Sequence, residues 1–121
     1  MLACLIALPF SVQAAPNAYQ KAMTCSGGNC PYTYHFITTP KVKKSIQQAF
    51  HRSKVQVPSW LFGSSVTVPV EPIKIKGRKV IKIDSCKPHD CPSDNLVGYY
   101  DPKVNKFSGT YTKNGRRITI Q

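Results

Sequence analysis

The residues Cys86-Lys87-Pro88-His89-Asp90-Cys91 are a combination whose types and spacing could do chemistry. Two cysteines with four residues between them can close a small disulfide ring if the protein matures in an oxidising compartment. Pro88 would stiffen this ring, because its side chain fixes φ at about −65° and it has no amide hydrogen. His89 and Asp90 would then lie at the tip of a rigid loop, which favours binding because less entropy is lost when a partner arrives.

Two other interpretations of this motif are open. A C-x4-C pair falls within the spacings of zinc ligands. Cysteines that flank proline and histidine also resemble the redox motif of thiol–disulfide oxidoreductases. Such enzymes usually place two residues between the cysteines and use a helix N-terminus to lower the thiol pKa. Here the spacer has four residues and no helix is predicted at Cys86, so the oxidoreductase is an alternative to a binding loop.

The N-terminal residues indicate export. Residues 1–14 are uncharged and are apolar over 2–10, and Val12-Gln13-Ala14 fits a signal-peptidase site. We therefore expect 1–14 to be a signal peptide and 15–121 to be a single mature domain. Cleavage would remove Cys4 and leave four cysteines, an even number suited to disulfides, at Cys25, Cys30, Cys86 and Cys91. No run of about 20 apolar residues follows, so no transmembrane helix is predicted in the mature chain.

The charge balance is strongly basic and the catalytic motifs are sparse. Seventeen Lys and Arg against five Asp and Glu give a net charge of +12, which favours attraction to polyanions. Several cations fall on one predicted hairpin: Lys74, Lys76, Arg78, Lys79 and Lys82. Polyanion binding is therefore a further alternative. Motifs of serine hydrolases, zinc proteases and phosphate-binding loops are absent, and Glu71 is the only glutamate. We predict no catalytic residues, no metal and no cofactor.

The first half of the mature chain is predicted to be helical in part. Thr39-Pro40 is a typical helix start, with a capping residue followed by proline at the first position. Apolar residues then recur at helical spacing and predict an amphipathic helix over 40–52. A short helix is expected over 16–23. Alternating aromatic residues predict an extended segment over 32–36.

From residue 66 onward, apolar residues follow a period of two, which predicts strands. A hairpin turning at Gly77 should have a basic face and an apolar face with Ile73, Ile75, Ile81 and Ile83. Lys113-Asn114-Gly115 is a tight-turn signal between the last two strands. We expect an α+β fold: an antiparallel sheet of about five strands, the 40–52 helix packed on one face, and the Cys86–Cys91 loop protruding from one end.

The sequence C-K-P-H-D-C resembles the signature loop of the Ivy family, which inhibits vertebrate c-type lysozyme. The resemblance extends to Pro58, Trp60 and Gly63 before the strands and to Leu96-Val97-Gly98 after the loop. Together with predicted export, it favours disulfides over zinc. Four cysteines allow three pairings, of which we expect the two local ones, Cys25–Cys30 and Cys86–Cys91.

The resemblance implies that this protein is an inhibitor and not an enzyme. The loop would enter the cleft of a lysozyme, where His89 engages the two catalytic carboxyl groups while Lys87, Pro88 and Asp90 shape and flank it. The expected partner is c-type lysozyme or another muramidase. Because +12 repels a basic enzyme, a less basic target such as a bacterial lytic transglycosylase is included. A homodimer is left open, and the expected location is the periplasm.

These inferences predict the covalent state of the exported protein. Its intact mass should correspond to a chain that begins near Ala15 and should not change on alkylation under native or denaturing conditions. After reduction, four alkyl groups should be added. Two or more free thiols before reduction would contradict the predicted pairing.

Overall fold

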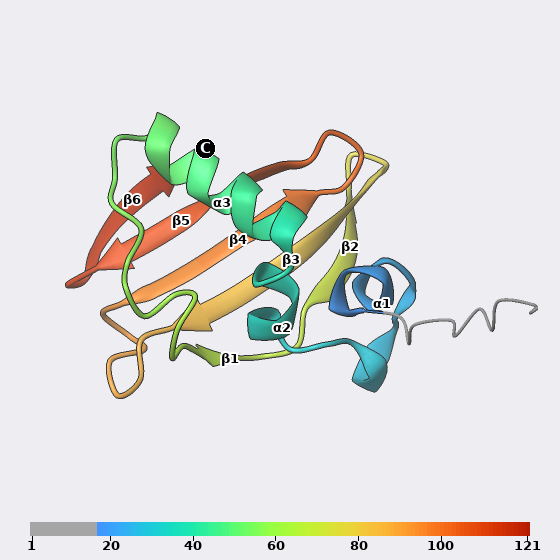
Figure 1. Ribbon diagram of the computed structural model, residues 1–121, viewed down its shortest axis with the longest axis horizontal. Helices are drawn as coiled ribbons and strands as arrows, with labels where there is room; N and C mark the ends of the chain where they lie inside the picture. Colours follow the sequence, from blue (N-terminus) through green and yellow to red (C-terminus); the bar gives the residue numbers. More distant parts are fainter. Residues whose placement is uncertain (1–16) are drawn as a thin grey trace, which may run out of the picture.

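The computed structural model describes residues 17–121, so the predicted signal peptide and its cleavage site lie outside the described residues. Over this range the chain forms an antiparallel sheet with helices packed on one face (Figure 1). The helices are α1 (Ala18–Thr24), α2 (Thr33–Ile37) and α3 (Pro40–Arg52), with a short 3-10 turn at Gly27–Asn29. The strands are β1 (Val66–Thr67), β2 (Glu71–Ile75), β3 (Arg78–Cys86), β4 (Asn95–Asp101), β5 (Lys106–Lys113) and β6 (Arg116–Ile120).

The expected α+β fold is confirmed. In the described part of the chain the sheet has six strands in the order β1-β3-β4-β5-β6, and β2 pairs with the same strand, β3, as β1 does. The strand beyond the expected five is the two-residue β1. It pairs with Ser85 and Cys86 at one end of β3, while β2 pairs with the other end. None of the helices over residues 17–121 is long and apolar enough to cross a membrane.

Helix α3 begins and ends at the predicted residues. Its buried positions recur at helical spacing: Val42, Ser45, Ile46, Ala49 and Phe50. The four apolar ones belong to the main core. Thr39 occupies the position before the helix, but its hydroxyl donates to the carbonyl of Phe36 at 2.6 Å and does not cap α3. The start of α3 therefore depends on the fixed φ of Pro40.

The extended segment predicted for 32–36 is wrong beyond its first residue. Tyr32 forms an isolated bridge with Pro69, but residues Thr33–Ile37 form α2. The reason is burial: Phe36 and Ile37 are adjacent and both are fully buried. A strand would point two successive side chains to opposite faces, whereas a helical turn can direct both towards the core. The short helix predicted near the N-terminus is confirmed as α1, capped by the Asn17 side chain.

The prediction of one apolar hairpin face is also wrong. Strands β2 and β3 are joined by the two-residue turn Lys76-Gly77, so Ile75 pairs with Arg78. Both turn residues have positive φ, which is the type I′ geometry. Cross-strand partners share a face, and this register places Ile75 on the face opposite to Ile81 and Ile83. The latter two are fully buried under the helices, while Ile75 is 40% exposed.

A pair of glycines in the middle of the sheet makes room for an aromatic ring. Gly98 of β4 pairs with Gly109 of β5, and Phe107 lies against both. A Cβ atom on Gly98 would be 2.5 Å from the Phe107 ring and 2.5 Å from the carbonyl oxygen of Ser108. Phe107 is 1% exposed, so its ring cannot move away without opening the core.

We therefore predict that Gly98→Ala destabilises the protein by about 1–3 kcal/mol, the usual cost of overpacking a core. Chemical denaturation would measure the free energy of unfolding. Gly28→Ala is the matched control, because a Cβ at Gly28 has no neighbour within 4 Å. Equal stability of Gly98→Ala and the parent protein would contradict this account of the glycine pair.

Candidate functional site

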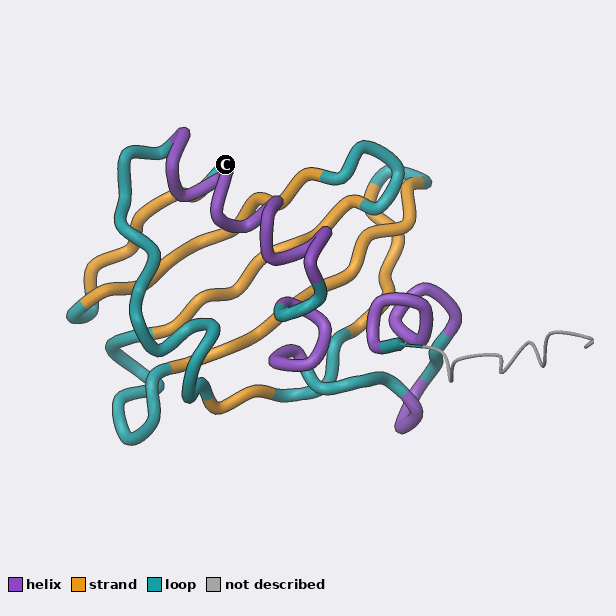
Figure 2. Tube along the Cα trace, viewed as in Figure 1, coloured by secondary structure: helices purple, strands orange, loops and turns teal. Residues whose placement is uncertain are grey.

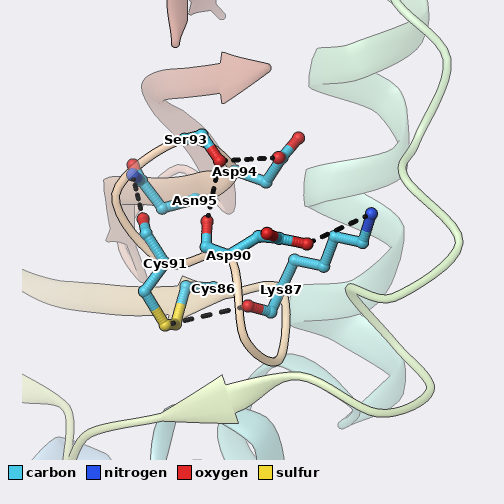
Figure 3. The surroundings of a disulfide bond; sticks show 7 residues. All are labelled: Cys86, Lys87, Asp90, Cys91, Ser93, Asp94 and Asn95. Carbon is cyan, nitrogen blue, oxygen red and sulfur yellow. Dashed lines mark hydrogen bonds and ion pairs between the residues drawn. A yellow bond between two sulfur atoms is a disulfide. The ribbon is translucent and has the colours of Figure 1, made fainter. Parts of the chain in front are cut away.

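The segment between β3 and β4 forms a compact loop closed by a disulfide, as predicted. Cys86 is the last residue of β3 and is bonded to Cys91, with Cα atoms 4.9 Å apart. Cys86 also pairs with Val66 of β1 and Asn95 of β4, so the ring is attached directly to the end of the sheet. Figure 3 shows the loop that connects these two strands beyond the disulfide.

The tip of the loop is a tight turn that presents His89. The Asp90 amide donates to the Lys87 carbonyl at 3.0 Å, which closes a four-residue turn. Pro88 takes the second position and His89 the third, with φ of 69°. This is the pattern of a type II turn, where the third position is usually glycine or asparagine. The left-handed conformation costs a histidine about 1–2 kcal/mol of conformational free energy. The proline and the disulfide ring therefore hold His89 in this conformation. Its side chain is exposed.

A second set of hydrogen bonds braces the loop internally. The Asp90 carbonyl accepts from the Ser93 and Asp94 amides at 3.0 and 2.9 Å, and the Lys87 amide donates to the Asp94 carbonyl at 2.9 Å. The Asn95 side chain donates to the Cys91 carbonyl at 2.8 Å (Figure 3). Cys91 Sγ lies 3.7 Å from the Lys87 oxygen, but a disulfide sulfur has no hydrogen to donate. The backbone of the loop is therefore fixed by its own polar groups.

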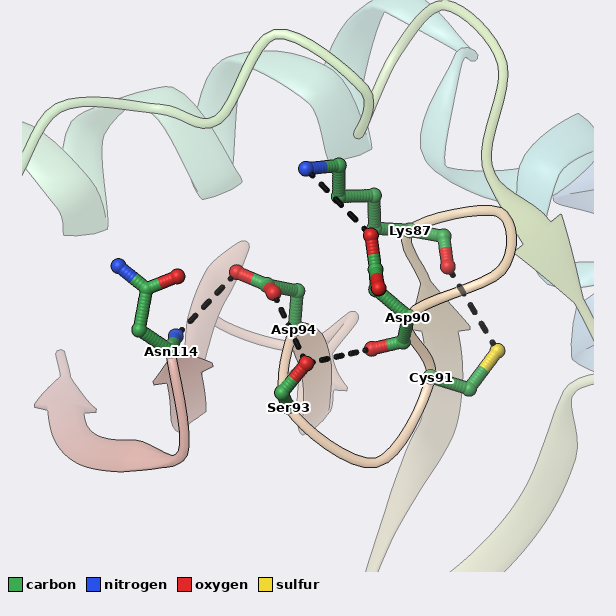
Figure 4. Close-up of polar contacts among 6 residues, drawn as sticks. All are labelled: Lys87, Asp90, Cys91, Ser93, Asp94 and Asn114. Carbon is green, nitrogen blue, oxygen red and sulfur yellow. Dashed lines mark hydrogen bonds and ion pairs between the residues drawn. The ribbon is translucent and has the colours of Figure 1, made fainter.

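The loop is also attached to the neighbouring β5–β6 turn. The Asn114 amide donates to Asp94 Oδ1 at 3.3 Å (Figure 4). The Gly115 amide donates to the Ser93 carbonyl at 2.9 Å. Asp94 is only 9% exposed, and its second oxygen accepts from the Ser93 hydroxyl at 3.2 Å. The Asn114-Gly115 pair has positive φ at both residues, as predicted for a tight turn. Sequence reasoning did not identify Ser93 and Asp94 as supporting residues, although both lie between the ring and the next strand.

The four residues singled out from the sequence lie together at this loop. Lys87, His89 and Asp90 are exposed and Pro88 is half-buried. Lys87 Nζ is 3.6 Å from Asp90 Oδ2, so the two flanking charges partly balance each other. This exposed pair contributes little to stability. Its effect is on the local field, because it leaves the tip with no unbalanced negative charge.

The base of the loop packs close to the long connection between α3 and β1. This connection has little regular structure and runs along the end of the sheet (Figure 2). A cavity of about 310 Å³ separates it from the loop, lined by Pro58 and Trp60 on one side and Lys87 and Asp94 on the other. Trp60 is 8% exposed and belongs to the core cluster.

The second cysteine pair is a disulfide as well, but it does not join this site. Cys25 and Cys30 enclose the short turn Gly27–Asn29, with Cα atoms 5.0 Å apart. This ring lies beside α1, away from the Cys86–Cys91 loop (Figure 1). Both disulfides remove the thiolates that zinc would need, and the described residues 17–121 contain no group of three or more His, Cys, Asp or Glu placed to hold a metal. Two disulfides also fit maturation in an oxidising compartment.

Comparison with models of protein families gives a match over most of the described chain. Residues 41–120 match the family model described as "Inhibitor of vertebrate lysozyme (Ivy)". The match covers α3, all six described strands and the Cys86–Cys91 loop, and it leaves out α1, α2 and the Cys25–Cys30 ring. No curated protein matches the chain significantly.

The position of Asp94 beneath the loop can be tested through its effect on the pKa of Tyr111. Burial raises the pKa of Tyr111, and the nearby Asp94 carboxylate raises it further. A tyrosine with a raised pKa stabilises the folded state below pH about 10, and this contribution is lost as the pH rises through the folded-state pKa. Asp94→Asn should lower the Tyr111 pKa but leave it above its ordinary value, because burial is the larger cause.

NMR titration of ¹³C-labelled tyrosine would measure this change. Asp90→Asn is the matched control, since Asp90 is exposed and its carboxylate contacts Lys87. An unchanged Tyr111 pKa in Asp94→Asn, or an equal shift in the control, would contradict the placement of Asp94.

Proposed function

The chain belongs to the Ivy family of lysozyme inhibitors, and from this premise we propose that it blocks a c-type lysozyme, or a related muramidase, by inserting the Cys86–Cys91 loop into the active-site cleft. The observation that carries the proposal is the position of His89. It is an exposed imidazole at the tip of a loop that is fixed by a disulfide, a tight turn and hydrogen bonds to a neighbouring turn.

The chemistry of an imidazole suits the cleft of a glycosidase. A retaining enzyme holds two carboxyl groups about 5 Å apart, one protonated and one ionised. The two ring nitrogens of histidine lie on opposite edges of a flat ring, and both donate hydrogen bonds when it is protonated. His89 can thus face both carboxyl groups without any covalent step. The ionised carboxyl group of the partner can accept one such hydrogen bond.

The residues beside His89 have supporting roles in this proposal. A free carboxylate at the tip would repel the catalytic carboxylates of the partner. Asp90 instead points to Lys87, and its backbone amide closes the turn (Figure 4). Pro88 holds the turn in its bound conformation before the partner arrives, so little conformational entropy is lost on binding.

The net charge of +12 bears on the choice of partner. Exposed charges are screened beyond about 8 Å at physiological salt, so repulsion between two basic proteins mainly slows association. We therefore include among the targets muramidases with a less basic rim, including a bacterial lytic transglycosylase that acts on the cell's own peptidoglycan. The proposed location of this encounter is the periplasm.

Polyanion binding through the β2–β3 hairpin is less well supported. Its cations do not form a single face: Lys74 pairs across the hairpin with Lys79, whereas Lys82 pairs with Glu71 on the opposite face. Lys79 Nζ donates to the Met23 carbonyl, and Arg78 forms an ion pair with Asp101 at 2.7 Å. An oxidoreductase is not favoured either, because Cys86 ends a strand and has no helix N-terminus to lower its thiol pKa.

We predict that His89→Ala weakens inhibition by about 30-fold or more, the effect of losing an anchor worth about 2 kcal/mol. A cell-wall lysis assay with several muramidases would give the inhibition constants. His89→Asn separates two causes, because asparagine tolerates a positive φ but lacks the ring, and it should be as weak as His89→Ala.

His51→Ala is the matched control, since His51 is an exposed histidine on α3. It should inhibit like the parent protein, and all variants should unfold at similar denaturant concentrations. If His89→Ala and the parent protein inhibit equally, the loop is not the inhibitory element.

A further inference from the structure

A pocket that the proposed inhibition does not use lies mainly on the face of the sheet opposite α3, and Arg52 at the end of α3 also lines it. The pocket has a volume of about 530 Å³ and lies at the end of the sheet formed by the β2–β3 and β4–β5 turns. The strand register assigns its walls to this face: Ile75 pairs with Arg78 across β2 and β3, and Asp101 with Lys106 across β4 and β5. A volume of this size is typical of a small-molecule site.

The floor of the pocket is apolar. It includes Ile75, Val80, Tyr99 and Val104. Val80 is 7% exposed although no helix of the described chain covers this face, whereas Ile75 and Val104 are 40% and 49% exposed. Two of the five large hydrophobic side chains that are exposed in the described residues therefore line one hollow. Such clustering marks a binding surface more often than scattered exposure does.

The rim of the pocket is positively charged. Four cations line it, Arg52, Lys76, Arg78 and Lys106, against one acidic side chain, Asp101. Asp101 is paired with Arg78 at 2.7 Å, so the remaining cations have no acidic side chain as a counterpart among the lining residues. An apolar floor under a cationic rim is complementary to a molecule with an aliphatic chain and an anionic head.

We propose that this pocket binds a free, single-chain anionic amphiphile, with the chain on the Ile75–Val80–Val104 floor and a carboxylate, sulfate or phosphate head at the Lys76 and Lys106 rim. A bilayer is a poorer fit, because a lipid surface is flat and would meet the cations without filling the hollow.

The proposed site is separate from the Cys86–Cys91 loop. Strand β4 begins beside the loop at Asn95 and reaches the pocket at Asp101, a span of seven residues, or about 20 Å. Amphiphile binding and inhibition can therefore be tested independently, and His89→Ala should bind the amphiphile like the parent protein.

Titration calorimetry and amide-resolved NMR of the processed protein with sodium decyl sulfate below its micelle concentration would test the proposal. We expect saturable binding at one site, with the largest NMR shifts in the β2–β3 and β4–β5 turns. Decyl maltoside, which has the chain but no charge, and sodium ethyl sulfate, which has the head but no chain, should each bind at least tenfold more weakly. Binding only to micelles or to phosphatidylglycerol vesicles would overturn the proposal.

Two matched pairs of variants localise the site. Ile75→Ser with Val104→Ser should weaken binding about tenfold or more, as expected for lost apolar contact. Val66→Ser with Val68→Ser removes two valines that are 51% and 50% exposed elsewhere and should have no effect. Lys106→Ala should weaken binding, whereas Lys74→Ala, which changes the charge equally outside the pocket, should not. Equal losses within either pair would show nonspecific attraction to a basic protein and overturn the proposal.

Discussion

The antiparallel pairing of β3 with β4 is the constraint on which the rest of the structure depends. The two strands form six cross-strand residue pairs, from Ile81–Tyr100 at one end to Cys86–Asn95 at the other. One face of this hairpin carries the buried Ile83 and Leu96 of the core. The opposite face carries the floor of the apolar pocket, and the end of the hairpin carries the disulfide loop. A slip of one residue in this pairing would exchange the two faces of the sheet. It would also move Cys86 away from the position in which it is bonded to Cys91.

The rigidity of the proposed inhibitory loop has several independent sources. The disulfide closes the ring, the proline fixes one backbone angle, and the β5–β6 turn supports the far side through Asp94 and Ser93. These restraints act before any partner is present. They explain how a non-glycine residue is maintained at a positive φ at the tip, and why binding by this loop would cost little ordering entropy.

A polar network joins the helical layer to the sheet at the end opposite the loop. The Tyr100 hydroxyl donates to the side-chain oxygen of Asn105, which also accepts from Ser45 of α3 at 2.9 Å. Burial raises the pKa of Tyr100, so its hydroxyl stays protonated and able to donate. The network holds the β4–β5 turn against α3, and this turn carries Val104 of the pocket and leads into Lys106 at the start of β5. The shape of the pocket therefore depends on the packing of the core on the other face of the sheet.

The sequence by itself determined the features that depend on local spacing. It predicted the bounds of α3, the two short disulfides with the loop between Cys86 and Cys91, and the Asn114-Gly115 turn, because helix initiation at proline, ring closure and turn geometry involve residues close along the chain. It also predicted the α+β class from the change of apolar period at residue 66. Only the tertiary structure decided which face each strand presents. The two-residue turn between β2 and β3 pairs Ile75 with Arg78, and this places Ile75 on the other face of the sheet from Ile81. It likewise decided that Phe36 and Ile37 form a helix, that Asp94 supports the loop through Asn114, and that residues from β2, β3, β4 and β5 line one pocket together with the end of α3. These features follow from burial and from contacts between distant residues, which no local pattern in the chain encodes.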